Sequence, residues 1–308
     1  MTDEPAEAAA LWGGTPLRLI VARENAVYEM ALPDGQRAAL RLHRTGYQDA
    51  AAIRSELWWC AELSRLGLPV PEPLALPEGG LLAILSAGRH ASAIRWIDGQ
   101  PLGQSGRPLT QPVAAQIDLH FRLGRLLRTL HESSDRLMMP DGFSRPRWDI
   151  DGLTGDAPLW GRFWEHPYAA YVQLSAQNAA RAAVRSMMTR HAAEGGDFGL
   201  IHADVLRENV LLSDDGLSLI DFDDSGFGYR LYDLGTVLSQ NQYEPARDDL
   251  RDALMAGYGT QDTEKVELFT LARVLASVGW TIPRLAADDP IHQRHLARAD
   301  MVIRRLLG

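Results

Sequence analysis

The sequence predicts an α+β protein with two lobes, a small antiparallel sheet that carries one helix and a larger, mainly helical lobe. Short apolar runs separated by turn residues fill residues 1–97, which is the pattern of β-strands. Long segments with apolar residues at helical spacing dominate residues 98–308. A chain of 308 residues, 46% of them hydrophobic, is long enough for two such units. We therefore place the boundary between the lobes near residues 97–101.

The first lobe begins with three strands joined by tight turns, over Leu17–Ala22, Val27–Leu32 and Ala38–Leu42. A helix is predicted over Asp49–Leu66, where apolar residues recur every three to four positions. Prolines at 69, 71 and 73 end the helical pattern, and a turn at residues 77–80 precedes two further strands, Leu81–Leu85 and Ser92–Ile97. The lobe is therefore expected to contain five strands and one helix.

The second lobe contains helical patterns over Val113–Ser133, over Trp160–Ala193 with one interruption, and repeatedly from Tyr232 to Leu307. Its exception is Leu200–Asp224, where two short apolar runs flank an Asp-Asp-Gly turn. Because Asp-Gly is a strong signal for a two-residue hairpin turn, a β-hairpin is expected at this point.

The composition excludes several classes of protein. A formal net charge of −9 without a run of basic residues opposes binding of nucleic acid. The single cysteine, Cys60, excludes a disulfide framework and any multi-cysteine metal site. No stretch approaches the roughly 20 apolar residues of a membrane span, and the first ten residues carry no basic leader. We expect a soluble, unprocessed, cytoplasmic protein without a nucleic acid or membrane partner, and its oligomeric state stays open.

The segment Ile201–Asn209 and the residues after the hairpin carry the side chains that indicate chemistry. Phosphoryl transfer needs a carboxylate that orients the attacking hydroxyl and oxygen ligands that hold Mg²⁺. Asp204 is placed to accept the hydroxyl proton, and Asn209, five residues later, can turn its amide oxygen toward the metal. Asp221 is expected to approach the same metal from the second strand of the hairpin. Alternation along that strand puts Asp223 on the same face, either as a second metal contact or as a solvated turn residue.

Other polar and aromatic residues are given structural roles. His202 is expected to hydrogen-bond within its loop, and Asp233 to cap a helix or brace that loop. His131 is interpreted as part of a polar helix end. The paired Trp58 and Trp59, and the aromatic group that begins at Trp160, lie at helical spacing and are expected to pack in the core.

The His-x-Asp-x4-Asn run followed by Ile-Asp-Phe-Asp resembles the catalytic and metal loops of the aminoglycoside phosphotransferase and homoserine/choline kinase superfamily, whose fold is that of protein kinases. The resemblance extends over most of the chain. The other segments that carry it are Ala22–Tyr28, Leu40–Leu42, Arg54–Glu56, Arg95–Gly99, Leu123–His131 and Tyr232–Gly235.

The resemblance implies that Asp204 is the catalytic base and that Asn209 and Asp221 bind Mg²⁺. It implies that residues 1–97 bind the nucleotide, ATP or GTP, and that residues 98–308 carry the catalytic and metal loops.

Within the nucleotide-binding lobe, the resemblance assigns roles to four residues. Glu56 is the acidic partner of the basic residue on the third strand, which here is Arg41. Asn25 at the first turn and Ile97 at the hinge are placed beside the nucleotide.

The chain departs from the family pattern in two ways. Residues 23–26 contain no glycine, so the backbone there would cover the phosphates without a glycine-rich loop. Arg41 stands where the family has a lysine, and the only lysine in the chain, Lys265, lies far away in the sequence. The two-pronged guanidinium of arginine suits both a phosphate and the Glu56 carboxylate.

Three functions are compatible with this pattern: a kinase of small molecules, a protein kinase acting on serine or threonine, and an inactive nucleotide-binding module. Only ten residues separate Asp221 from Tyr232, and no Ala-Pro-Glu occurs downstream. A protein kinase needs a longer activation segment there, so a small hydroxylated acceptor is favoured.

The acceptor itself stays open, as does the choice between ATP and GTP. The residues after Tyr232 include several carboxylates. These form either the wall of a pocket for a compact, cationic acceptor or a solvated helix face. They are Glu244, Asp248, Asp249 and Asp252.

Overall fold

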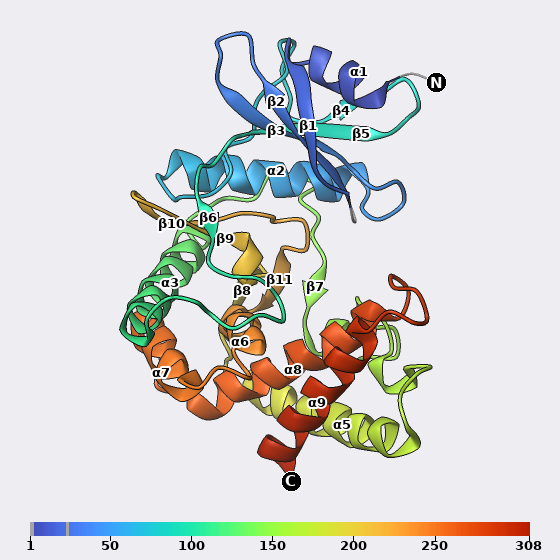
Figure 1. The fold of residues 1–308 in the computed structure, drawn as a ribbon, viewed down its shortest axis with the longest axis vertical. Coiled ribbons are helices and arrows are strands. Elements are labelled where there is room, and N and C mark those ends of the chain that lie inside the picture. Colours follow the sequence, from blue (N-terminus) through green and yellow to red (C-terminus); the bar gives the residue numbers. More distant parts are fainter. Residues whose placement is uncertain (1–2, 23–24) are drawn as a thin grey trace. The chain divides into compact units, whose positions relative to one another are not determined.

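The structure is a computed structural model that describes residues 3–22 and 25–308. The loop residues Arg23 and Glu24, part of the predicted phosphate-covering turn, lie outside the described residues. An antiparallel sheet in the N-terminal part and helices in the C-terminal part confirm the predicted α+β class (Figure 1).

Contacts between Cα atoms divide the chain into two units. The N-terminal unit comprises Met1–Gln100, Arg136–Arg145 and Leu211–Asp223. The C-terminal unit comprises Pro101–Asp135, Pro146–Val210 and Asp224–Gly308.

The sheet of the N-terminal unit has five strands in the order β1-β2-β3-β5-β4, and every neighbouring pair is antiparallel (Figure 1). The five strands were predicted, with shifts of a few residues at their ends. They are β1 (Thr15–Ala22), β2 (Ala26–Ala31), β3 (Arg37–Leu42), β4 (Ala83–Ile84) and β5 (His90–Arg95).

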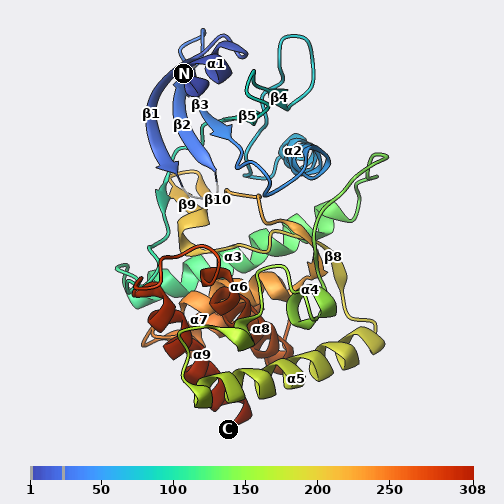
Figure 2. The same ribbon diagram turned by 90° about the vertical axis from the view of Figure 1, so that its right-hand side faces the viewer.

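The predicted helix of this unit is α2 (Ala50–Arg65), which lies along one side of the sheet and is seen end-on in Figure 2. The Asp49 side chain caps its first turn by accepting a hydrogen bond from the Ala52 backbone amide at 2.8 Å. The helix ends at Arg65, Leu66 is its C-terminal cap, and Gly67 follows with a φ of 82°, a conformation in which glycine carries no steric cost.

A second helix, α1 (Glu4–Ala10), was not predicted, so the expectation of a single helix in this unit was wrong. The Asp3 side chain accepts from the Ala6 amide at 3.4 Å, and a proline lies in the first turn. Ala8 and Ala9 are fully buried against the sheet. The alanine-rich composition of the first ten residues hides this apolar face, because alanine gives little periodic contrast.

The C-terminal unit is mainly helical (Figures 1 and 2). Its helices are α3 (Val113–Ser134), α4 (Ile150–Thr154), α5 (Tyr171–Ala193), α6 (Leu231–Gln240), α7 (Arg247–Tyr258), α8 (Thr263–Thr281) and α9 (Ile291–Leu307), with short 3₁₀ turns at Phe163–Glu165 and Arg207–Asn209. It also contains a small sheet of order β7-β11-β8, made of β7 (Arg147–Trp148), β11 (Gly226–Tyr229) and β8 (Phe198–Ile201).

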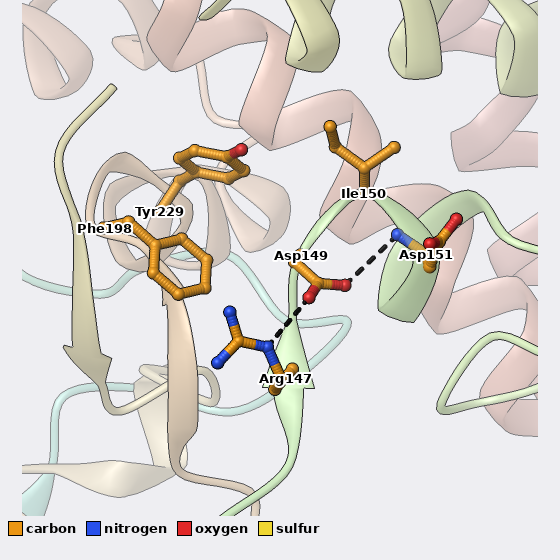
Figure 3. A pocket seen from close by; sticks show the side chains of 6 residues that line it. All are labelled: Arg147, Asp149, Ile150, Asp151, Phe198 and Tyr229. Atoms are coloured by element: carbon orange, nitrogen blue, oxygen red, sulfur yellow. Dashed lines mark hydrogen bonds and ion pairs between the residues drawn. The ribbon is translucent and has the colours of Figure 1, made fainter. Parts of the chain in front are cut away.

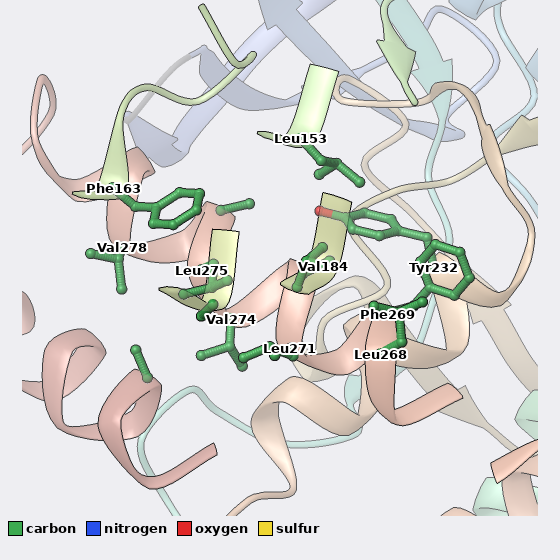
Figure 4. Close-up of a cluster of buried hydrophobic side chains, with 14 of the residues drawn as sticks. Leu153, Phe163, Val184, Tyr232, Leu268, Phe269, Leu271, Val274, Leu275 and Val278 are labelled. Atoms are coloured by element: carbon green, nitrogen blue, oxygen red, sulfur yellow. The ribbon is translucent and has the colours of Figure 1, made fainter. Parts of the chain in front are cut away.

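Helix α8 runs through the core of this unit, and Figure 4 shows its apolar side chains gathered with those of neighbouring segments. Leu271, Val274, Leu275 and Val278 are almost fully buried, so the helix is apolar on most of its circumference. Trp160 and its aromatic neighbours are buried in the same cluster, which confirms that they pack in the core.

The predicted hairpin consists of β9 (Val210–Ser213) and β10 (Gly216–Leu219), and the short β6 (Gln100–Pro101) extends it to a three-stranded sheet. Asp221 does not lie on the second strand, contrary to the prediction. The strand ends at Leu219, and Asp221 has a φ of 65°, which is incompatible with extended pairing. Strand alternation therefore does not relate Asp221 to Asp223.

Among the described residues, no helix has both the length and the apolar composition needed to cross a membrane.

Candidate active site

The segment between β8 and β9 is held by the carboxylate of Asp233, in the first turn of α6. Its Oδ2 accepts from the His202 amide at 2.9 Å and its Oδ1 from the Ala203 amide at 2.7 Å. Ala203 has a φ of 65°, a strained conformation for a residue with a side chain, and these two hydrogen bonds stabilise it. The predicted loop-bracing role of Asp233 is confirmed.

His131 on α3 supports Asp233 from the other side. Its Nε2 lies 3.0 Å from Asp233 Oδ2, and its Nδ1 lies 3.0 Å from the hydroxyl of Tyr258. All three side chains are buried. The interpretation of His131 as part of a polar helix end was therefore wrong, because its position on the apolar face of α3 turns it inward.

Asp204 and Asn209 are brought together, as their spacing predicted. The Asn209 amide nitrogen donates to the Asp204 backbone oxygen at 2.9 Å and to its Oδ2 at 3.0 Å. The backbone amide of Asp204 lies 3.3 Å from His202 Nδ1, which fits the structural role expected of that histidine. The Asp204 carboxylate is thus fixed from within its own loop.

The sequence analysis missed Arg273, which lies in the middle of α8. Its Nη2 donates to Asp204 Oδ1 at 2.6 Å, and its guanidinium lies 4.4 Å from the centre of the Trp160 ring. Arg273 is only 3% exposed. A single arginine within the mostly apolar stretch Leu268–Val278 is the signal that could have revealed it, because buried charges need partners.

A buried ion pair holds the end of the same loop. Arg207 Nη2 lies 2.7 Å from Glu244 Oε1 and 2.8 Å from Asn241 Oδ1, and its backbone amide donates to Gln240 Oε1 at 2.7 Å. Glu244 is buried by this pairing, so it is neither a solvated residue nor a free wall for a cationic ligand.

The remaining acidic residues of the α7 region do not form a pocket wall either. Asp248 pairs with Arg247 and Arg251, and Asp252 pairs with Arg251; the two carboxylates are exposed and the two arginines are half-buried. Asp248, Asp249 and Asp252 are exposed, so of the two interpretations, a pocket wall or a solvated helix face, the second applies to them.

In the N-terminal unit, the expected ion pair between the third strand and α2 is present. Arg41 Nη1 lies 2.7 Å from Glu56 Oε1 and 3.7 Å from Asp223 Oδ1, and all three residues are buried. Burial alone would lower the pKa of Arg41, but the carboxylates of Glu56, Asp223 and Asp221 raise it above the ordinary arginine value. The guanidinium is therefore a permanent cation in this unit.

Asn25 belongs to the same cluster. Its amide nitrogen donates to Asp223 Oδ2 at 3.2 Å, and its Oδ1 accepts from the Arg44 amide at 3.0 Å. Asp221 is exposed, whereas Asp223 is buried between Arg41 and Asn25. Asp223 is thus an anchored side chain rather than a solvated turn residue.

Arg145 is a second residue that the sequence analysis missed. Its Nη2 donates to the backbone oxygens of Phe222 and Asp223, at 3.2 and 2.5 Å, and its Nη1 to the oxygen of Ala52 at 3.0 Å. Arg145 therefore ties the segment after Asp221 to α2. Nothing in its local sequence distinguishes it from the other arginines.

The remaining predicted residue, Ile97, is half-buried in the connection between β5 and β6. Asp204 and Asn209 belong to the C-terminal unit, whereas Asp221, Asp223, Arg41, Glu56 and Asn25 belong to the N-terminal unit.

A hollow of about 320 Å³ opens on the small sheet of the C-terminal unit (Figure 3). Arg147 Nε lies 3.0 Å from Asp149 Oδ2 at its edge. Tyr229 lines the hollow, and burial together with the charge of Asp149 raises the pKa of its hydroxyl. None of the predicted site residues lines it. The lining consists of Arg147, Asp149, Ile150, Asp151, Phe198 and Tyr229.

The fold is that of the protein-kinase-like phosphotransferases. An aminopropanol kinase associated with microcompartments superposes with a TM-score of 0.77 and 26% identity, covering 94% of this chain and 90% of that one. The amicoumacin kinase hAmiN, in complex with AMP-PNP, Ca²⁺ and Ami, shares the fold at a TM-score of 0.72 and 16% identity, over 94% and 88%. A thermostable mutant of the aminoglycoside phosphotransferase APH(4)-Ia shares it at 0.67 and 15%, over 96% of both chains.

Residues 17–269 match the model of the phosphotransferase enzyme family, and the chain belongs to that family. A Bacillus subtilis (strain 168) amicoumacin kinase is 26% identical over 242 residues, which are 76% of this chain and 66% of that protein. An uncharacterized protein of Deinococcus radiodurans is 27% identical over 262 residues, 82% of this chain and 72% of that protein. The predicted membership of the aminoglycoside phosphotransferase superfamily is confirmed.

Proposed function

We propose that this protein is a small-molecule kinase that transfers the γ-phosphoryl group of ATP or GTP to a hydroxyl of a small metabolite or an aminoglycoside-like acceptor. The observation that carries the proposal is the Asp204 carboxylate, which Asn209 and Arg273 fix by hydrogen bonds in a loop braced by Asp233. A carboxylate fixed in this way suits the orientation of an attacking hydroxyl.

In the proposed reaction, Asp204 accepts the proton of the acceptor hydroxyl as its oxygen bonds to the γ-phosphorus. The bond from that phosphorus to the β–γ bridging oxygen breaks, and the nucleoside diphosphate leaves with the electron pair. The strained backbone at Ala203, directly before Asp204, is consistent with a functional loop, because such strain concentrates at active sites.

Asn209 and Asp221 are the proposed Mg²⁺ ligands, since amide and carboxylate oxygens are the donors that this ion prefers. The Asn209 amide nitrogen donates to Asp204, which leaves its Oδ1 as the atom for a cation. The donor set therefore fits Mg²⁺, which neutralises phosphate charge when bound. Asp223 is already engaged by Arg41 and Asn25.

The N-terminal part, residues 1–97, is proposed to bind the nucleotide, and residues 98–308 to carry the catalytic and metal loops. Arg41, held by Glu56, supplies the cation that the family takes from lysine. Asn25 and Ile97 are proposed to lie beside the nucleotide.

The short segment after Asp221 favours a small acceptor over a protein. Residues 226–229 form β11 and α6 begins at Leu231, so the chain returns to regular structure within ten residues. The segment offers no long platform for an extended peptide. The relatives named as aminopropanol and amicoumacin kinases support the same class of acceptor.

The test is a nucleotide-coupled screen of hydroxylated metabolites, amino alcohols and antibiotics with ATP and with GTP, in the presence of Mg²⁺. We expect Asp204→Asn to lower turnover by about 10²-fold or more with the affinity for nucleotide nearly unchanged, because the base acts on the acceptor. Asp214→Asn, in the exposed hairpin turn, is the control. Near-normal turnover in Asp204→Asn, or faster labelling of a generic protein substrate than of any small alcohol, would overturn the proposal.

A further inference from the structure

We propose that the acceptor of this kinase carries an anionic group, a carboxylate or a phosphate, which Arg298 binds together with Arg273 in the C-terminal unit. This inference rests on the proposed function, because it concerns the molecule whose hydroxyl Asp204 would orient.

The first observation is that Arg273 is buried with most of its hydrogen-bonding capacity unused. Its Nη2 donates to Asp204, but its Nε and Nη1 are buried and have no hydrogen-bond partner among the described residues. A guanidinium has five donor hydrogens, and leaving buried donors unpaired costs free energy. A further acceptor atom beside Asp204 would remove that cost.

The second observation is Arg298 on α9. Its Nη1 donates to the Ser239 backbone oxygen at 3.3 Å, and its Nη2 lies 2.9 Å from His295 Nδ1. Its Nε is buried without a partner, and no carboxylate among the described residues lies within ion-pair distance of the guanidinium. Arg298 is therefore a half-buried cation without a carboxylate partner among the described residues.

Arg298 is connected to the catalytic loop through the end of α6. Ser239, which accepts its hydrogen bond, directly precedes Gln240, and Gln240 Oε1 accepts from the backbone amide of Arg207 in that loop. On the same helix, Thr236 Oγ1 donates to the backbone oxygen of Ala203 at 3.3 Å. The C-terminal half of α6 thus contacts Arg298 on one side and the residues that flank Asp204 on the other.

Cationic neighbours surround Arg298, whereas Arg273 is paired with Asp204. Burial lowers the pKa of Arg298 to about 10, with the charges of Arg273 and Arg294 acting in the same direction against that of Tyr243. Burial and the same arginines lower the pKa of His295 to about 2. Helices α8 and α9, which carry Arg273 and Arg298, pack against each other in the C-terminal unit, and His292 Nδ1 lies 3.1 Å from Thr281 Oγ1 between them. Asp204 is the carboxylate that pairs with Arg273.

Two buried arginines of the chain show what a protein counter-charge looks like. Arg41 pairs with Glu56, Arg207 with Glu244, and both members of each pair are buried. Arg298 has no such carboxylate partner among the described residues. Since the planar guanidinium matches a carboxylate or a phosphate with two parallel hydrogen bonds, a ligand of that chemistry would complete the site.

A purely structural role for Arg298, as a cap on the carbonyl end of α6, makes a different prediction. Loss of a cap lowers stability and affects all acceptors alike. Loss of an anion-binding group raises the KM of anionic acceptors and spares their neutral or cationic counterparts.

The experiment compares acceptors that differ by an anionic group: glycerate and glycerol 3-phosphate against glycerol, serine against ethanolamine, and threonine against 1-aminopropan-2-ol. We expect the wild type to prefer the anionic member of each pair it phosphorylates. Arg298→Gln should raise the KM for that member about tenfold or more, with kcat little changed, and Arg298→Lys should recover part of the loss. Arg304→Gln, on the exposed side of the same helix, is the matched control.

Binding is measured separately from catalysis, as the rise in Tm caused by glycerate and by inorganic phosphate without nucleotide. A rise in the wild type and in Arg304→Gln that is absent in Arg298→Gln supports the anion site, even if no acceptor is phosphorylated and the proposed function fails. Three results overturn the inference while Asp204-dependent turnover leaves the kinase assignment intact. These are preference for the uncharged or cationic members, equal loss for both members in Arg298→Gln, and no anion effect on either KM or Tm.

Discussion

At the scale of single residues, the chain replaces the usual lysine of the third strand with an arginine and surrounds it with carboxylates. Arg41 is buried, and Glu56 and Asp223 lie within 2.7 and 3.7 Å of its Nη1. Glu56 Oε2 is itself buried without a hydrogen-bond partner, so Arg41 and Glu56 are joined by the single Nη1–Oε1 contact and not by two parallel hydrogen bonds. Removing Arg41 leaves the buried Glu56 carboxylate without its counter-charge, which is strongly destabilising, whereas removing Glu56 leaves Arg41 beside Asp223.

We therefore expect Arg41→Ala to raise the KM for nucleotide and to lower turnover together. Arg41→Lys should be partly tolerated, because it keeps the charge and loses the planar geometry. Glu56→Ala should show a milder form of the same defect. The measurement is a double-mutant cycle on kcat/KM for nucleotide, with thermal unfolding of each variant as a control for folding. A coupling energy near zero would mean that the Arg41–Glu56 contact does not serve nucleotide binding.

At the scale of elements, α6 and α8 supply the side chains that fix the catalytic loop. Asp233 in the first turn of α6 accepts two backbone hydrogen bonds, and Arg273 in α8 reaches Asp204. Both helices pack inside the C-terminal unit, so these side chains are held by a rigid core. A helical scaffold of this kind positions a loop more accurately than the loop could position itself.

Asp233→Ala should therefore lower the free energy of unfolding by about 3 kcal/mol, because it leaves the amides of His202 and Ala203 and the side chain of His131 without their buried acceptor. Urea unfolding monitored by circular dichroism measures the change. Asp249→Ala, at an exposed position of α7, serves as the control and should stay within about 0.5 kcal/mol of the wild type. An equally small change in Asp233→Ala would show that the loop does not depend on this carboxylate.

At the scale of the whole molecule, the two proposed metal ligands lie in different units of the chain. Asn209 belongs to the C-terminal unit and directly precedes β9. Asp221 belongs to the N-terminal unit and follows the end of β10 by two residues. Asp221, like Ala203, has a positive φ, and these are the two non-glycine residues with that conformation among those described. Backbone strain thus occurs beside both proposed functional loops.

If Asn209 and Asp221 are the Mg²⁺ ligands, Asn209→Ala and Asp221→Ala should both shift the Mg²⁺ concentration for half-maximal turnover upward by about tenfold or more, because few protein oxygens hold this ion. Turnover is measured across a Mg²⁺ titration at fixed total nucleotide. Asp215→Ala, exposed in the hairpin turn, should leave the titration unchanged. An unshifted titration in either variant would remove that residue from the metal site.

Much of the fold could be predicted because its signals are local. The strands of the first sheet, the span of α2 and the hairpin at residues 210–219 are indicated by apolar spacing and by turn residues. The pairing of Asp204 with Asn209 is also local, since five residues separate them. The helix α1 and the end of β10 were misjudged, because alanine gives little contrast and because Asp221 takes a backbone conformation that spacing does not reveal.

The sequence by itself determined the fold class, the family and the residues of the proposed catalytic and metal loops, because each depends on residue types at short spacing. Only the tertiary structure decided which distant side chains reach those loops. Arg273 lies 69 residues from Asp204 and Asp233 lies 31 residues from His202, and they meet because α6 and α8 pack in one core. The charge around Arg298 was likewise decided by packing, since burial and neighbouring cations depend on which helices lie side by side.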